Sequence, residues 1–357
     1  MPSEKQDAYV SPMRVFVAKG SKAEKSVRSR TTMPAVLAPG ITPSPKHDLI
    51  FHGGKTIADL TFVNFFVGGS AAWNPSDVQS INDGLSAAMS DKNLNNVMSQ
   101  YYPSGHITST FQGSHILAGP KPAKVSQGDV ENLVRRLFQA GTLSGVNFAS
   151  TVLNFMLPSG TVLTTDLAPT SGAVSSHVES SNTLQATPVS AAKAVPHEDE
   201  EDSTNGLGGY HGSVHLGTGS AAQTIYYAVG VFSEKLANGT ENGIPVFDQS
   251  WKNVVATFYH ELNEARTDPD VEDAINAGNS PNAVKFLGWT SSQGEECGDF
   301  PVAEANPLTQ VFKELKLTNS QTIVPVQLQY SDADHGPGMP RPTAAPFAGK
   351  SKHHKAG

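Results

Sequence analysis

The stretch ATFYHELNEARTDPD, residues 256–270, contains the helical pattern on which the prediction of the fold rests. An apolar stripe recurs at spacings of three and four along residues 249–267, which predicts an amphipathic helix that packs on a sheet. The members of this stripe are Val254, Val255, Phe258, Leu262 and Ala265. Pro269 disfavours helical geometry at the residue before it, so we expect the helix to end near Thr267.

The same helix presents two candidate metal ligands. His260 and Glu264 are four residues apart, so their side chains lie on one face, one turn above the other. The two histidines of HExxH zinc helices reach one ion at this spacing, and Glu261 occupies the position of that motif's general base. Asp268 follows at the expected end of the helix, from which its carboxylate can turn back toward the ion.

A second acidic cluster follows in GEECGD, residues 294–299. Glu295, Glu296 and Asp299 lie there in a glycine-flanked loop, and we expect Glu296 and Asp299 to complete the ligand set. One imidazole with two or three carboxylates suits zinc, and it also suits manganese or calcium. The alternative is ordinary surface charge, because an amphipathic helix often has histidine and glutamate on its solvated face.

Three further side chains are weaker candidates for the site. His211 and His215 are four residues apart in a predicted strand, where that spacing separates them by about 13 Å, so they do not easily share one ion. His211 can still approach the helix, or it can be a buried, hydrogen-bonded imidazole. Cys297 has no nearby partner in the sequence and is expected to be a small buried thiol rather than a nucleophile.

Outside the helix, alternating strand and helix patterns predict an α/β fold. Short apolar and β-branched runs predict strands, which fall at 48–54, 60–69, 150–158, 161–163, 209–217, 223–232 and 323–330. Periodic stripes predict further helices at 73–91, 128–141 and 305–316, the first capped by Asn74. The runs at 150–158 and 161–163 are expected to pair, as are those at 209–217 and 223–232. This order predicts a mixed sheet with packed helices, α/β or α+β, in a layered architecture.

Composition shifts divide the chain into a body and less ordered segments. Prolines and scarce apolar periodicity predict a disordered arm at 1–45 and a disordered tail at 332–357, around a single α/β domain at 46–331. Inside that domain, residues 168–206 are rich in Ser, Ala, Thr and Pro and end in HEDEEDSTNG. They are expected to form a disordered acidic insertion.

Composition also excludes several classes of protein. The net charge of −8 over 357 residues argues against a nucleic-acid partner. Cys297 is the only cysteine, so a disulfide-built scaffold is excluded. No signal-peptide core and no apolar run of about 18 residues is present, so we expect a soluble, cytoplasmic protein with no membrane partner. Export by another route stays open, and the sequence does not predict the oligomeric state.

The helix and the acidic loop together resemble bacterial proteins related to the plant phosphate-induced (exordium-like) family. In that pattern the helix reads HExxEAxTDP and a later loop reads GW followed by GEIGD; Asp268, Trp289, Glu296 and Asp299 fall on its positions. Upstream, GYHGSVH at 209–215 is similar to the family's CGxH segment, with Gly209 in place of the cysteine, and residues 61–85 are similar to its strand-then-helix opening. The resemblance implies a relative of metallohydrolases.

Two functions follow as expectations. The first is a zinc-dependent hydrolase of zincin-like architecture, with peptidase as one candidate activity, which acts on a small-molecule or peptide substrate. In it Glu261 would deprotonate a water molecule that attacks a polarised carbonyl group. The second is a non-catalytic, exordium-like protein with a structural metal ion or an interaction role. The two differ in whether the ion has an open position that faces a cleft.

Overall fold

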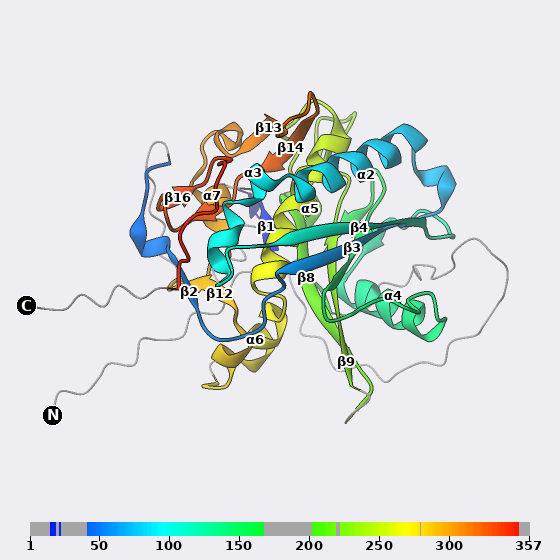
Figure 1. Cartoon of the computed structure of the whole chain (residues 1–357). Coiled ribbons are helices and arrows are strands. Elements are labelled where there is room, and N and C mark those ends of the chain that lie inside the picture. Colours follow the sequence, from blue (N-terminus) through cyan, green and yellow to red (C-terminus); the bar gives the residue numbers. More distant parts are fainter. Residues whose placement is uncertain are drawn as a thin grey trace, which may run out of the picture.

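A mixed six-stranded sheet forms the centre of the computed structural model, which describes residues 15–18, 21–22, 41–167, 202–218, 222–278 and 280–349 (Figure 1). In spatial order its strands are β1 (Val15–Val17), β8 (Leu207–Leu216), β9 (Gln223–Gly230), β6 (Thr151–Met156), β3 (Asp59–Phe66) and β4 (Thr108–Ile116). The last four strands are parallel, whereas β8 is antiparallel to both β9 and β1. The mixed sheet with its packed helices confirms the predicted α/β class.

Helices cover both faces of this sheet. The alternation of side chains along β3 sends Phe62 and Phe66 to one face, where they pack with α2 (Pro75–Ser90) and α5 (Ser250–Thr267). It sends Val63 and Phe65 to the other face, where they pack with α4 (Gln127–Gln139). The sheet is therefore the middle layer of three, with its apolar residues on both faces.

The ends of the helices follow the capping signals in the sequence. The side chain of Asn74 accepts a hydrogen bond from the backbone N–H of Ser76 at the start of α2, as predicted. Ser126 and Asp129 form a reciprocal capping box at the start of α4. The helix α5 ends at Thr267, as Pro269 predicts.

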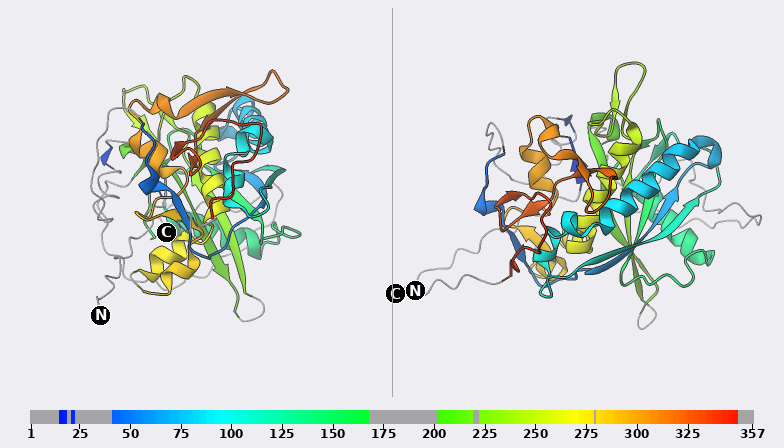
Figure 2. Two further views of the ribbon diagram at one scale, coloured as in Figure 1. Left: turned by 60° about the vertical axis from the view of Figure 1, so that its left-hand side comes forward. Right: turned by 45° about the horizontal axis from the view of Figure 1, so that its top comes forward.

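The helix α5 is buried on all sides over most of its length. Every residue from 253 to 267 is buried. The sheet covers one side, and a hairpin of β13 (Phe312–Lys316) and β14 (Ile323–Gln327) covers another, because Val324 and Val326 pack in the same apolar cluster as Leu262. Figures 1 and 2 show α5 between the green strands of the sheet and the orange hairpin. The polar residues of α5 therefore face protein rather than solvent.

The remaining elements are short. They comprise the helices α3 (Lys92–Asn95), α6 (Val271–Ala277) and α7 (Asp299–Glu304), and the paired strands β2 (Leu49–Phe51) with β12 (Trp289–Ser291), β5 (Lys124–Val125) with β7 (Val162–Leu163), β10 (Glu234–Lys235) with β11 (Glu241–Asn242), and β15 (Tyr330–Ser331) with β16 (Gly336–Pro337). None of the helices in the described ranges is both long and apolar enough to cross a membrane.

Three local expectations differ from the structure. The predicted helix at 305–316 is wrong, since residues 312–316 form β13 and obtain their backbone partners from β14. The strands predicted at 150–158 and 161–163 exist, but they do not pair with each other: β6 lies between β3 and β9, and β7 pairs with β5. The strand β4 was not predicted because TSTFQGSHI is mostly polar.

The predicted arm, insertion and tail also differ where the structure describes them. Within 1–45, residues 15–17 form the edge strand β1. Within 168–206, Asp202 caps a short 3-10 helix at Ser203–Asn205, while residues 168–201 lie outside the described residues. Within 332–357, residues up to 349 are described, with β16 paired to β15 and Phe347 packed against Trp289. Long-range partners, which local composition does not encode, hold the described residues of these segments in place.

Candidate functional site

The polar face of α5 points into the protein and forms the centre of the candidate site. His260 and Glu261 are 0% exposed and Glu264 is 1% exposed, so the prediction of one shared helix face holds but the solvated-face alternative does not. His260 Nε2 lies 3.0 Å from Glu264 Oε2. The two side chains are thus neighbours across one helical turn, as their spacing predicts.

The tautomer of His260 is set by Gln327 at the end of β14. The side-chain nitrogen of Gln327 donates to the carbonyl oxygens of Gly298 and Leu328, so its Oε1 faces His260 Nδ1 at 3.0 Å. Because Oε1 can only accept, Nδ1 is the protonated nitrogen and donates. In the neutral ring this leaves the lone pair on Nε2, which faces the carboxylates, as a metal ligand requires.

Glu264 is held by the loop after β12. Its Oε1 accepts a hydrogen bond from the backbone N–H of Gly298 at 3.0 Å, which turns Oε2 toward the imidazoles. A Cβ atom on Gly298 would overlap the ring of His260 and lie 2.9 Å from Glu264 Oε1. Only glycine lets the loop approach α5 this closely.

His211 of β8 lies inside the cluster, although its sequence position gave only a weak signal. Its Nδ1 faces Glu261 Oε2 at 3.2 Å and Glu264 Oε2 at 3.8 Å. Its Nε2 faces Glu296 Oε1 at 3.5 Å and the carbonyl oxygen of Asp268 at 3.3 Å. The strand therefore brings a second imidazole to the carboxylates of the helix and the loop.

The acidic loop contributes Glu296 directly and Asp299 indirectly. Glu296 is 0% exposed and neither of its carboxylate oxygens has a hydrogen-bond partner. Asp299 Oδ2 accepts the backbone N–H of Glu296 at 2.9 Å and so holds the turn that presents Glu296. Glu295 instead pairs with His47 Nδ1 at 2.6 Å, away from the cluster.

Two groups of side chains among the described residues could hold a metal ion. His211, Glu264 and Glu296 form one, and His260, Glu261 and Glu264 form the other; within each, one ligand atom per residue lies within 4.8 Å of the rest. Glu264 belongs to both. The predicted ligands Asp268 and Asp299 belong to neither, although Asp268 Oδ2 is buried and unpaired while its Oδ1 accepts the N–H of Gly288.

Burial and mutual repulsion act on the acids of the cluster. Burial raises the pKa of Glu261 to about 8, against a weaker lowering effect of the hydrogen bond from His211. Burial, with added repulsion from Glu264, also raises the pKa values of Asp268, Glu296 and Asp299 well above their usual range. Burial is the largest single effect on the pKa of His260 and lowers it, but the charges of Glu264 and Asp299 and the hydrogen bonds with Glu264 and Gln327 together outweigh burial, so the net shift is upward. The cluster therefore lacks positive charge to match its acids.

The unpaired atoms point to what the cluster can bind. Glu261 Oε1, Asp268 Oδ2 and both carboxylate oxygens of Glu296 are buried without hydrogen-bond partners, and His260 Nε2 faces another lone-pair atom, Glu264 Oε2 at 3.0 Å. All of them are lone-pair donors in the neutral imidazole or ionised carboxylate, and none requires a further acceptor. A divalent cation satisfies such a set, whereas a neutral ligand does not supply the missing charge.

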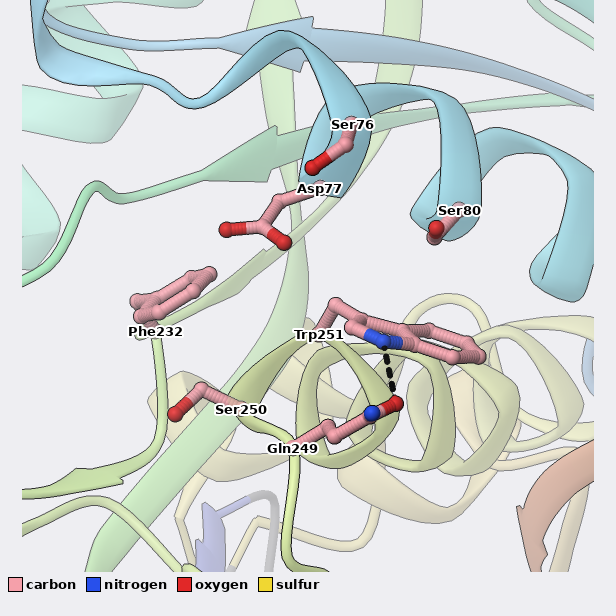
Figure 3. Close-up of a pocket in the computed structure, with 7 residues that line it drawn as sticks. All are labelled: Ser76, Asp77, Ser80, Phe232, Gln249, Ser250 and Trp251. Carbon is pink, nitrogen blue, oxygen red and sulfur yellow. Dashed lines mark hydrogen bonds between the residues drawn. The ribbon is translucent and has the colours of Figure 1, made fainter.

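A pocket on the surface lies elsewhere. Its lining joins the starts of α2 and α5 and consists of Ser76, Asp77, Ser80, Phe232, Gln249, Ser250 and Trp251 (Figure 3). Trp251 and His260 are separated by about 14 Å along the helix, given a rise of about 1.5 Å per residue. The pocket includes none of the predicted site residues.

The sequence contains no signal for the position of Gln327 and only a weak signal for that of His211. The spacing of two histidines within one strand does not indicate which helix that strand will pack against. The similarity of GYHGSVH to a family segment was the available signal for His211. Comparison with known proteins gave no match, either to a family model, to a curated protein or to a solved structure.

Proposed function

We propose that this chain is a zinc-dependent hydrolase of peptides. In this proposal His260, Glu264, His211 and Glu296 hold the ion and Glu261 is the general base. The observation that supports it most is the convergence of two imidazoles and three glutamates inside the protein, with both oxygens of Glu296 unpaired. Asp268 and Asp299 would not bind the ion themselves. Each would hold the backbone near the ligands in place, since each has a carboxylate oxygen that accepts a backbone N–H of a nearby loop.

The cost of leaving this cluster without a cation favours an ion. An unpaired carboxylate in the interior costs several kcal/mol in effective desolvation, and here several lie together. Protonation of the acids would lower that cost and would let Glu264 donate to His260 Nε2, but the oxygens of Glu296 would still lack a hydrogen-bond partner. One divalent ion would bind both the carboxylate oxygens of Glu296 and the Nε2 atom of His260.

The mixture of donor atoms favours zinc. Calcium takes oxygen ligands almost exclusively, so two imidazoles in the cluster disfavour it. Manganese accepts carboxylates with imidazole and is the closest competitor, whereas zinc prefers a small set of nitrogen and oxygen donors of this kind. The imidazole of His260 is already oriented for such a role by Gln327.

Glu261 has the arrangement that a general base needs. Its Oε2 is 3.2 Å from His211 Nδ1, which orients the carboxylate, and its Oε1 is unpaired and available for a proton. A bound zinc ion would supply Lewis-acid polarisation of a carbonyl group and would lower the pKa of a coordinated water molecule. We also propose that the arrangement of α5 packed on a mixed sheet is a zincin-like architecture.

A second candidate function rests on a different observation. None of the four proposed ligands is more than 1% exposed, which suits a closed structural ion. In that case the ion would join the sheet, α5 and the loop after β12, without any reaction. Both candidates require the metal, and only the first requires a substrate.

The experiment has two stages. Protein purified without a histidine tag is analysed by plasma mass spectrometry, where we expect about one zinc ion per chain after incubation with zinc and desalting. Zinc-loaded and chelator-treated protein are then tested against a peptide library by mass spectrometry. Cleavage only with zinc supports the hydrolase. Full metal loading without cleavage supports the structural ion, and absence of metal contradicts both.

A further inference from the structure

β1, the first strand among the described residues, lies directly beside the candidate site. β1 pairs antiparallel with the edge of β8, with Phe16 opposite Gly209 and Val17 opposite Leu207. The backbone N–H of Ala18 donates to the carbonyl oxygen of Gly206 at 2.6 Å and extends this pairing. β8 is also the strand that contributes His211. A three-residue strand thus covers the sheet edge next to the buried cluster.

Phe16 fills a slot over a proposed metal ligand. Its ring stacks on the imidazole of His260, with centroids 4.2 Å apart and planes inclined by 29°. Ile244 and Phe312 belong to the same apolar cluster and form the sides of the slot. Phe16 is 1% exposed, so the slot encloses the whole aromatic side chain.

The slot exists because β8 has a glycine at the contact. A Cβ atom on Gly208 would lie 2.7 Å from Phe16 Cδ1 and 3.1 Å from Ile244 Cδ1, so any other residue would close the space. The slot accepts a side chain from a strand that lies alongside β8. The edge of β8 supplies the backbone hydrogen bonds and the slot supplies side-chain selectivity, which are the two parts of peptide recognition by strand addition.

We propose that the edge of β8 and the aromatic slot form the binding surface for an extended polypeptide substrate with an aromatic residue, and that β1 occupies this surface as a competitor within the chain. β1 binds in the manner that the substrate would. Removal of β1 would expose the unpaired backbone groups of β8 and one face of His260. The substrate class rests on the proposed function, but binding of a strand to this edge does not.

The test uses the full-length chain with one substitution in β1. Phe16→Ser removes the ring from the slot, and Lys22→Ser, at an exposed residue beyond the strand, is the matched control. The probe is a fluorescein-labelled peptide of residues 14–22, RVFVAKGSK, with a second peptide in which serine replaces the phenylalanine. Fluorescence anisotropy is measured on zinc-loaded and chelator-treated protein, and circular dichroism follows folding.

We expect the Phe16→Ser chain to bind the peptide at least about tenfold more tightly than the wild type or the control, because a tethered segment competes at a millimolar effective concentration. The serine peptide should bind at least about tenfold more weakly to the same chain. Equal binding to all three chains overturns the inference. Loss of the folded state in the Phe16→Ser chain also overturns it, since β1 would then be an obligatory strand.

The outcome is separable from that of the proposed function. Tight, aromatic-dependent binding to the Phe16→Ser chain with no metal content and no cleavage would leave the surface in place and remove the hydrolase. Zinc-dependent cleavage of other peptides at equal rates by the wild-type and Phe16→Ser chains, without binding of the probe, would keep the hydrolase and remove the surface. If both proposals hold, Phe16→Ser should raise the rate of peptide cleavage.

Discussion

His260 Nδ1 lies 3.0 Å from Gln327 Oε1, and this contact decides which imidazole nitrogen faces the carboxylates of the candidate site. The orientation of the amide is fixed in turn, since its nitrogen donates to two backbone carbonyl groups. The strand β14 therefore fixes the side chain of His260 with Nε2 toward the carboxylates.

Replacement of Gln327 by leucine should weaken zinc binding by about 10–100-fold, the usual effect of losing the partner of a ligating imidazole. Gln327→Glu retains an acceptor and should bind zinc at least as tightly as the wild type. Affinity is measured by competition with a chromogenic chelator, and Gln79→Leu on the exposed face of α2 is the control. Equal affinity in the Gln327→Leu protein would show that this hydrogen bond does not prepare the site.

Glu261→Gln should lower the rate of peptide hydrolysis by about 10²–10⁴-fold, the usual contribution of a positioned base. Zinc content should change little, because the glutamine oxygen can still accept from His211 Nδ1. His260→Ala should instead lose zinc and thermal stability together, since it removes a ligand. Hydrolysis that survives in the zinc-loaded Glu261→Gln protein would exclude Glu261 as the base.

Gly298→Ala should destabilise the protein by about 1–3 kcal/mol, the typical cost of an added methyl group in a closely packed interior. The new Cβ would overlap the ring of His260, so zinc affinity should fall as well. Gly336→Ala is the control, since its Cβ would meet only the Cα of Pro43 at 3.7 Å. Urea unfolding of the three proteins measures the difference. A neutral effect at Gly298 would mean that the loop can move from α5 without penalty.

Asp332 should make stability depend on pH. Burial raises the pKa of this carboxyl group to about 6, although it accepts the N–H of Leu49 and the hydroxyl of Tyr101. The folded state therefore holds a proton that the unfolded chain releases near pH 3.9, so the free energy of unfolding should fall by about 2 kcal/mol from pH 4 to pH 7 through this group. Asp332→Asn should remove that fall and be the more stable protein at pH 7. Parallel pH profiles for the two proteins in urea unfolding would refute the assignment.

Local signals in the sequence were sufficient for the elements that depend on neighbouring residues. The start of α2 at Asn74 and the end of α5 before Pro269 follow from caps and backbone restrictions within a few positions. The common face of His260 and Glu264 follows from helical geometry alone. These features need no knowledge of the rest of the chain.

The parts that the sequence did not predict depend on distant partners. β1 exists because Phe16 meets His260 and β8, and β13 exists because β14 supplies its hydrogen bonds. The apolar periodicity of α5 predicts a helix with one face in solvent. The polar face is buried instead because the hairpin of β13 and β14 also packs on this helix. His211 reaches Glu261 only through the packing of β8 on α5.

The complete enclosure of the proposed ligands has a kinetic consequence. An ion held by side chains that are at most 1% exposed can leave only when the backbone around it opens. The loop that donates the N–H of Gly298 to Glu264 is the segment whose release would open that route. Exchange of bound zinc for isotopically labelled zinc should then proceed at the rate of this local opening, whatever the concentration of added chelator. The residence time of the ion would therefore be set by the opening rate of the loop and not by the affinity of the site.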